Sequence, residues 1–233
     1  MTDFKDDIFA LTLGIRYNKS FRIPDISGEI IDDILYNDNT PFGADYFPTV
    51  QGISDQEKTL FNPKNEYLRI NTDDLIIGIA VDNNFEERFD WLHTEVLDYL
   101  EYLFREYEIR NIRRLGIVFS HRIKNNKKLD EAISLLTGDA IADAENIVIS
   151  FSKKAPADEG LYRKDVNDYK NRIYNFREVK GIVYADLDYQ YYYEPGVGNF
   201  HNSFTKAIVT DAKSFLEHTY YDWLNRIYES SKT

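Results

Sequence analysis

The sequence predicts an α+β fold in which an antiparallel sheet is covered by two long amphipathic helices and one order of elements occurs twice. Three observations predict this fold. An apolar strand rich in β-forming residues opens each half of the chain, at residues 7–17 and 112–123. Short strands separated by turn residues follow each opening strand. Each half then closes with apolar residues spaced three and four apart, at 85–107 and 199–228, which is typical of an amphipathic helix.

The first half continues from its opening strand into a short helix. Pro24 and the apolar residues from Ile26 to Leu35 follow helical spacing, and residues 38–43 have the composition of a turn. Three or four short strands are expected between residues 44 and 81, the clearest being Tyr67–Asn71 and Leu75–Val81. The long helix over 85–107 closes this half.

The second half is expected to repeat the order. A short helix is predicted at Leu129–Leu136 and a long closing helix from Asn199 to Tyr228. The strands between these helices are predicted near residues 146–153, 160–166, 171–178 and 181–193.

Internal duplication explains this repetition. Leu13-Gly14-Ile15 matches Leu115-Gly116-Ile117 at an offset of 102, which also brings Ile79-Ala80-Val81 onto Gly181-Ile182-Val183. The alternative is that Leu-Gly-Ile is common in strands. We therefore expect a single compact domain over residues 1–233, built from two pseudo-repeats at 1–108 and 109–233.

The order strand, helix, four strands and long helix resembles the β-α-β(4)-α units of TATA-box-binding-protein-like folds. In those folds a curved antiparallel sheet holds its C-terminal helix. The resemblance is topological and covers the whole chain. It implies a fold and no function, and DNA binding does not transfer to a chain this acidic.

Charge is distributed unevenly along the chain. The net charge is −12, of which residues 1–108 contribute −14 and residues 109–233 contribute +2. An acidic surface repels phosphate backbones, so nucleic acid is disfavoured as a partner of the first half. The chain has no cysteine, which excludes disulfides and thiol nucleophiles and fits a reducing compartment. Its acidic start is no signal peptide and no segment suits a membrane, so we expect a cytoplasmic protein.

Catalytic signatures are missing from the sequence, so no catalytic residue and no cofactor are predicted. The four histidines follow no metal-binding spacing. Asp186 and Asp188 share one face of a strand with Tyr184, and paired carboxylates hold Mg²⁺ in some proteins. The same alternation is typical of a half-solvated strand, so these two residues are weak metal candidates only. Enzyme activity stays an open question, and a non-enzyme is favoured.

Two segments are candidate binding sites. The basic island is the acid-free stretch from Ile109 to Leu129, which suits an acidic protein or a nucleic acid. The alternative is that its bases pair with carboxylates of the first half, those of helix 85–107 included, or are solvated. Gly196 and Gly198 precede the closing helix, where main-chain amides can bind an anion; the alternative is a plain turn. The island contains seven basic residues, Arg110, Arg113, Arg114, Arg122, Lys124, Lys127 and Lys128.

A second resemblance rests on the strand Arg113–Ile123, on Tyr184–Tyr189 with its Asp-Leu-Asp, and on the aromatic helix that ends the chain. These segments resemble a sporadically distributed family of functionally uncharacterised bacterial proteins of similar length. The resemblance covers mainly residues 110–230, and Val118 departs from it because the family usually has arginine there. Its patchy distribution is typical of antiviral-defence and toxin–antitoxin genes.

The function hypothesis is therefore a non-catalytic binding or accessory protein of the bacterial cytoplasm, a partner subunit in a defence or toxin–antitoxin-like system. Its partner is expected to be a protein of unknown identity. The alternative is a nucleic-acid-binding or metal-dependent nuclease-like protein that uses the basic island. A third class is a carrier of a small ligand between sheet and helix.

Overall fold

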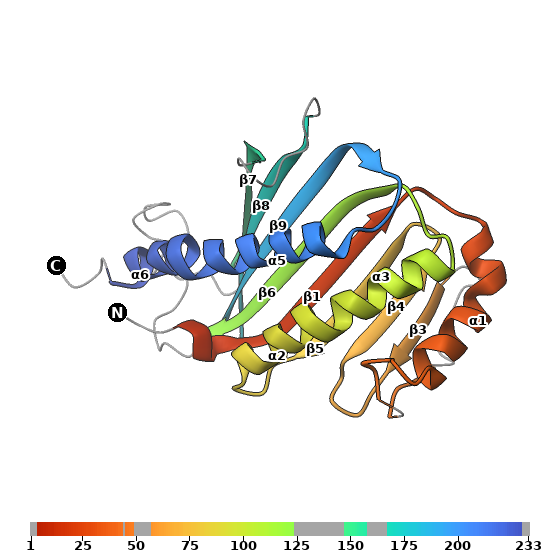
Figure 1. The fold of residues 1–233 in the computed structure, drawn as a ribbon. Helices are drawn as coiled ribbons and strands as arrows, with labels where there is room; N and C mark the ends of the chain where they lie inside the picture. Colours follow the sequence, from red (N-terminus) through yellow and green to blue (C-terminus); the bar gives the residue numbers. More distant parts are fainter. Residues whose placement is uncertain (1–3, 44, 49–56, 124–146, 158–166, 230–233) are drawn as a thin grey trace.

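The computed structural model describes residues 4–43, 45–48, 57–123, 147–157 and 167–229. Nine strands of these residues form one sheet in the order β2-β3-β4-β5-β1-β6-β9-β8-β7, and every pairing is antiparallel (Figure 1). The strands are β1 (Ile8–Tyr17), β2 (Phe47–Pro48), β3 (Glu57–Phe61), β4 (Tyr67–Asn71), β5 (Asp74–Ala80), β6 (Ile112–Ile123), β7 (Val148–Pro156), β8 (Tyr169–Val179) and β9 (Ile182–Val197). The helix expected at 129–136 and the strand expected at 160–166 lie outside the described residues.

The two opening strands pair with each other at the centre of the sheet. Gly14 of β1 lies opposite Gly116 of β6, and β5 and β9 flank this pair. The offset of 102 holds for the opening strands but is wrong for the strands beside them. Ile77 lies opposite Leu13, whereas Tyr191 lies opposite Leu115, so the offset there is larger. Strands of both halves therefore belong to one continuous antiparallel sheet.

Three long helices are present in the described part of the chain, one more than expected. The helix α1 (Arg22–Tyr36) is longer than predicted. The other two are α2 (Phe85–Trp91) with η2 (Leu92–Val96) and α3 (Leu97–Glu106), and α5 (Asn202–Phe215) with η4 (Leu216–Tyr220) and α6 (Tyr221–Glu229). Both composite helices agree closely with the helices predicted at 85–107 and 199–228. They lie side by side across one face of the sheet (Figure 1).

The core lies between this sheet face and the helices. Leu13 and Ile15 of β1 and Ile117 of β6 are almost completely buried, as are Leu100 and Leu224 of the helices. Burial of one such side chain contributes about 1.5–3 kcal/mol, so the apolar stripes of the helices position them on the sheet. A short helix, η1 (Phe4–Asp7), adds Phe4 to the same core.

The acidic first composite helix pairs with lysines of the second. The Lys206 ammonium lies 2.6 Å from the Asp98 carboxylate, and Lys213 pairs with Glu86. The side chain of Asn202 also donates to Asp98. The alternative for the basic island assigned such pairs to its own bases, whereas these two lysines belong to α5, and Lys5 of η1 also pairs with Glu86.

Candidate functional site on the open face of the sheet

The sheet face opposite the two composite helices, here called the open face, carries the half-exposed side chains of the central strands. In β1, Leu13 and Ile15 are buried toward the helices, while Thr12 and Gly14 are partly exposed and Arg16 is exposed. The same alternation runs along β6 and most of β9. Successive strand residues point to opposite faces, so these residues form one surface.

Small side chains form the centre of the open face. Gly14 lies opposite Gly116, and a Cβ atom added at Gly14 meets nothing within 4 Å. A Cβ atom at Gly116 would make ordinary contacts with Gln190 at 3.6 Å and with Asp188 at 3.7 Å. A partner can therefore approach the main chain of β1 and β6 closely.

Asp186 and Asp188 both lie on the open face, beside the glycines at its centre. The two residues share one side of β9, as the sequence predicts. Asp186 is opposite Ser120, and Asp188 is opposite Val118. Burial raises the pKa of both carboxyls, and Asp188 accepts a hydrogen bond of 2.6 Å from Gln190. Removing a carboxylate from water disfavours its charged form, which accounts for the direction of both shifts.

Mg²⁺ is commonly held by one or two carboxylates, with waters completing its coordination shell. Within the described ranges, no group of three or more histidines or acidic residues is placed to hold a metal. One oxygen of Asp188 is also engaged by the Gln190 amide. The weak metal candidates are thus a pair of half-buried acceptors on the open face.

The basic island is not one patch, because its described residues lie at both ends of β6. Arg114 and Arg122 lie on the open face, opposite Tyr192 and Tyr184 respectively. A strand rises about 3.3 Å per residue, which separates the two ends of β6 by tens of ångströms. Arg177 of β8 lies opposite Tyr184 and brings a further cation to the Arg122 end.

The remaining island residues lie elsewhere. Arg110 pairs with Glu108 at 3.2 Å, and the Arg113 guanidinium donates to the side chain of Asn18 at 2.6 Å. The Arg110 contact is with a carboxylate of the first half, as the alternative for the island expected, but neither contact is with a carboxylate of the composite helix 85–106. Lys124, Lys127 and Lys128 lie outside the described residues.

Two stacked aromatic rings with a cation on either side form a row across one end of the open face. The Lys154 ammonium lies 3.5 Å from the centre of the Tyr169 ring, which stacks on Tyr192 with centroids 4.6 Å apart. The Arg114 guanidinium lies 5.9 Å from the Tyr192 ring. This row crosses β7, β8, β9 and β6 and fixes four long side chains, which lowers the entropy lost when a partner binds.

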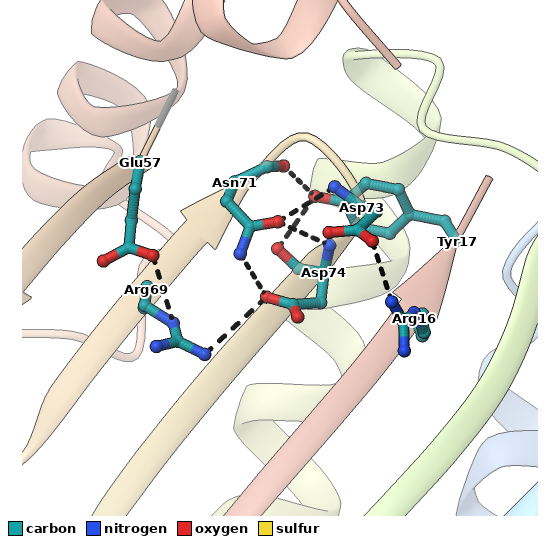
Figure 2. Close-up of polar contacts among 7 residues, drawn as sticks. All are labelled: Arg16, Tyr17, Glu57, Arg69, Asn71, Asp73 and Asp74. Carbon is teal, nitrogen blue, oxygen red and sulfur yellow. Dashed lines mark hydrogen bonds and ion pairs between the residues drawn. The ribbon is translucent and has the colours of Figure 1, made fainter. Parts of the chain in front are cut away.

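A second polar cluster lies at the end of β1 that is nearest to this row, where Arg16 lies opposite Arg114 of β6 (Figure 2). The Asn71 side chain accepts from the main-chain amides of Asp73 and Asp74, both at 2.9 Å, and so fixes the turn between β4 and β5. Arg16 then donates to Asp73 at 2.9 Å, and the Tyr17 hydroxyl contacts the main-chain oxygen of Asn71 at 2.7 Å. Asp73, held by this turn, therefore orients the open-face arginine Arg16.

The glycines proposed as an anion turn lie apart from the start of the helix. Gly196 is the penultimate residue of β9, and the Gly198 carbonyl accepts from the Asn111 amide at 3.0 Å. Helix α5 begins at Asn202, whose main-chain amide donates to the Glu101 carboxylate at 3.2 Å. A carboxylate of the protein thus occupies this helix start.

The histidines have different environments. His121 is completely buried, and its Nδ1 lies 3.0 Å from the Ala185 carbonyl. His93 stacks on Phe89 and lies 3.1 Å from the Thr210 hydroxyl, while His201 and His218 are exposed. His121 and His93 thus each contact a polar group of the protein.

Sequence reasoning missed several open-face residues. Arg16, Arg177, Lys154 and Tyr169 were not candidates, because none belongs to a charge cluster in the sequence. Period-two alternation along β8 and β9 could have placed Arg177 and Tyr169 on one face. The proximity of Lys154 and Arg114 needs the strand order, which alternation does not provide.

No protein-family model matches this chain, and a comparison with curated proteins finds no significant match. Among the described residues, no helix is both long and apolar enough to cross a membrane.

Proposed function

We propose that the chain is a non-catalytic binding protein that contacts a protein partner through the open face of its sheet. A single observation carries this proposal. The helices cover one face of the sheet, while the other face has Gly14 and Gly116 at its centre, bordered by fixed arginine, aspartate and tyrosine side chains. Aromatic residues and arginine are enriched at protein interfaces. Membership of a defence or toxin–antitoxin-like system rests on the resemblance of residues 110–230 and stays a prediction.

We also propose that the two halves are tandem pseudo-repeats. Outward from the central β1–β6 pair, the order β5, β4, β3 on one side corresponds to β9, β8, β7 on the other. Each composite helix contains a five-residue π-helical segment that begins at a leucine, η2 or η4. An aspartate and a leucine follow each segment at the same spacing, Asp98 and Leu100 or Asp222 and Leu224. Matched irregularities of this kind favour common descent over convergence.

Gly14→Gln is expected to abolish partner binding without loss of stability. The new side chain has open space above the sheet, and glycine inside a strand is itself destabilising. The glutamine side chain would cover the main chain of β1 and β6, which a partner must approach. Affinity purification of the tagged protein from its native cells, with quantification of the stoichiometric partner, measures the effect.

Gly28→Gln is the matched control, because Gly28 is an exposed glycine of α1 with nothing within 4 Å of an added Cβ. It makes the same chemical change on another surface and should retain the partner. Equal retention by both variants would place the interface away from the open face.

Nucleic-acid binding is the second candidate, favoured by the presence of three arginines, Arg114, Arg122 and Arg177, on the open face. Under this alternative, Arg114→Ser with Arg122→Ser should weaken an electrophoretic shift of single- or double-stranded probes and reduce its salt dependence. The absence of any shift by the unmodified protein, at low and at moderate salt, rejects it.

A further inference from the structure

The last strand of the sheet, β7, has a free outer edge in the described part of the chain. It pairs with β8 over its whole length, from Val148 opposite Arg177 to Pro156 opposite Tyr169, and with no other described strand (Figure 1). At the opposite edge, β2 has two residues and ends in Pro48, so it offers little for pairing. Of these two edge strands, β7 is the one long enough to receive a further strand.

Hydrogen bonds at both ends of β7 show which of its main-chain groups point outward. The Glu178 amide donates to the Ile147 carbonyl at 3.0 Å, and the Ala157 amide donates to the Asp168 carbonyl at 3.2 Å. In an antiparallel pair, residues bonded in this way alternate with residues whose amides and carbonyls point away from the partner strand. Because the pairing with β8 has no register shift, the even-numbered residues turn their main-chain groups outward. These residues are Val148, Ser150, Ser152, Lys154 and Pro156.

The two halves of this edge differ in how they are protected. Lysine and proline protect edge strands from unwanted pairing, and in β7 they occur in the second half, at Lys153, Lys154 and Pro156. The first half, Val148 to Ser152, contains neither a charge nor a proline. Its outward amides have no hydrogen-bond partner among the residues that the structure describes. The first half is therefore open to pairing with another strand.

Apolar side chains accompany these amides on the side of the sheet that carries the helices. Phe151 is 42% exposed, although its ring stacks on Tyr174 with centroids 4.8 Å apart and lies 5.6 Å from the Trp223 ring. Ile149 is partly buried and points to the same side, because it is two residues away. The edge is already ordered by these contacts, so a strand added there would cover both side chains at a low cost in entropy.

Charge indicates the kind of segment that fits this edge. Lys153 and Lys154 are exposed, and neither forms an ion pair within the described ranges. No acidic residue occurs in β7 itself. A second copy of the chain fits poorly, because self-pairing would bring the lysines of both copies together and would join two chains of net charge −12. A segment with carboxylates near these lysines is complementary instead.

We propose that the β7 edge binds an extended segment of a partner protein, which adds to the sheet as a further antiparallel strand. The segment would bond the outward main-chain groups of Val148 to Ser152, and its alternate apolar side chains would cover Phe151. Acidic residues at its start would lie beside Lys153 and Lys154. This site is separate from the open face and does not require the partner proposed for that face.

Fluorescence anisotropy with a labelled peptide, at constant ionic strength, tests the proposal. The probe is Glu-Glu-Thr-Val-Thr-Val-Thr, with its glutamates opposite Lys154 and Lys153 and its valines opposite Phe151 and Ile149. It should bind saturably, and an unlabelled competitor with lysines in place of the glutamates should bind about tenfold more weakly than the unlabelled probe. Lys153→Glu with Lys154→Glu should reverse this preference. No saturable binding, equal binding of both peptides, or an unchanged preference in the double variant overturns the proposal.

Methylation of peptide amides separates strand addition from charge attraction. The amides of the first two threonines would face β7, because these residues lie opposite Ser152 and Ser150, whereas the valine amides would face away. Methylating the two threonine amides should weaken binding about tenfold, and methylating the two valine amides should weaken it less than about twofold. Equal effects of the two modifications would exclude main-chain pairing and overturn the proposal.

Ser150→Pro makes the complementary change in the protein. It removes an outward amide without removing a bond to β8, as Pro156 does at the end of the strand, so the chain should fold and bind the probe about tenfold more weakly. Ser150→Ala is the matched control, because it loses the same hydrogen bond to Asn175 and keeps the amide. Equal binding by both variants overturns the proposal. A dimer in analytical ultracentrifugation that Ser150→Pro dissociates would assign the edge to a second copy and overturn it as well.

Discussion

Replacing Glu66 with glutamine is expected to lower the free energy of unfolding by about 3 kcal/mol, the largest single effect predicted for this chain. Glu66 is buried, and its carboxylate accepts from the Asn62 side chain at 2.8 Å and from the Tyr46 hydroxyl at 3.1 Å. It also pairs with Arg88, which stacks on Trp91 at 4.4 Å. Glutamine leaves the Arg88 charge without its partner and turns one acceptor into a donor.

Glu57→Gln is the control for this prediction. Glu57 lies 3.8 Å from Arg69, and both side chains are more than a third exposed, Glu57 at 40% and Arg69 at 35%. Exposed pairs contribute less than about 1 kcal/mol, so this variant should be nearly neutral. Urea unfolding of both variants, followed by circular dichroism, measures the difference, and equal stabilities would contradict the role assigned to Glu66.

The Glu66–Arg88 pair illustrates which parts of the fold the sequence could not predict. Apolar spacing of three and four predicted both composite helices, because one face of each helix covers the sheet. Alternation likewise predicted the strands at Tyr67–Asn71 and near 75–81, which the structure confirms with small changes at the ends. An ion pair between a strand turn and a helix depends on how the elements pack, and local periodicity contains no information on that packing.

The candidate site was predicted only in part for the same reason. Period two placed Asp186 and Asp188 on one face of β9, and the structure agrees. The strand predicted through the middle of the basic island was expected to separate its two ends, and the structure agrees, because Arg113 and Arg122 lie near opposite ends of β6. Two cations that pair with the acidic helix, Lys206 and Lys213, come from a segment more than a hundred residues away, and a third, Lys5, comes from the start of the chain.

His121 is expected to make the protein less stable as the pH falls from about 7 to 5. The side chain is fully buried between Ala185 and the rings of Tyr220 and Tyr221, whose centroids lie 5.6 and 5.8 Å away. Burial lowers its pKa from 6.5 to about 4, against the opposing effect of hydrogen bonds to the Ala185 and Phe119 main chain. A proton on Nε2 would have no acceptor among the described residues.

The sign follows from proton counting. Between pH 6.5 and 4 the unfolded chain holds a proton on His121 and the folded chain does not, so stability rises with pH in this window and is lost on acidification. The loss attributable to His121 between pH 7 and 5 is about 2 kcal/mol. The raised pKa values of Asp186 and Asp188 act in the opposite direction, because those carboxyls bind protons more tightly in the folded state.

The variant His121→Asn separates the contribution of the histidine to pH-dependent stability from that of these carboxyls. Asn at position 121 keeps a donor for the Ala185 carbonyl and cannot titrate, so His121→Asn retains the carboxyl contributions and removes only that of the imidazole. Urea unfolding of both proteins at pH 7.0 and 5.0 should show that the difference in free energy between them shrinks by about 2 kcal/mol on acidification. A difference that is the same at both pH values would mean that His121 binds its proton as tightly in the folded chain as in the unfolded chain, which would contradict the lowered pKa.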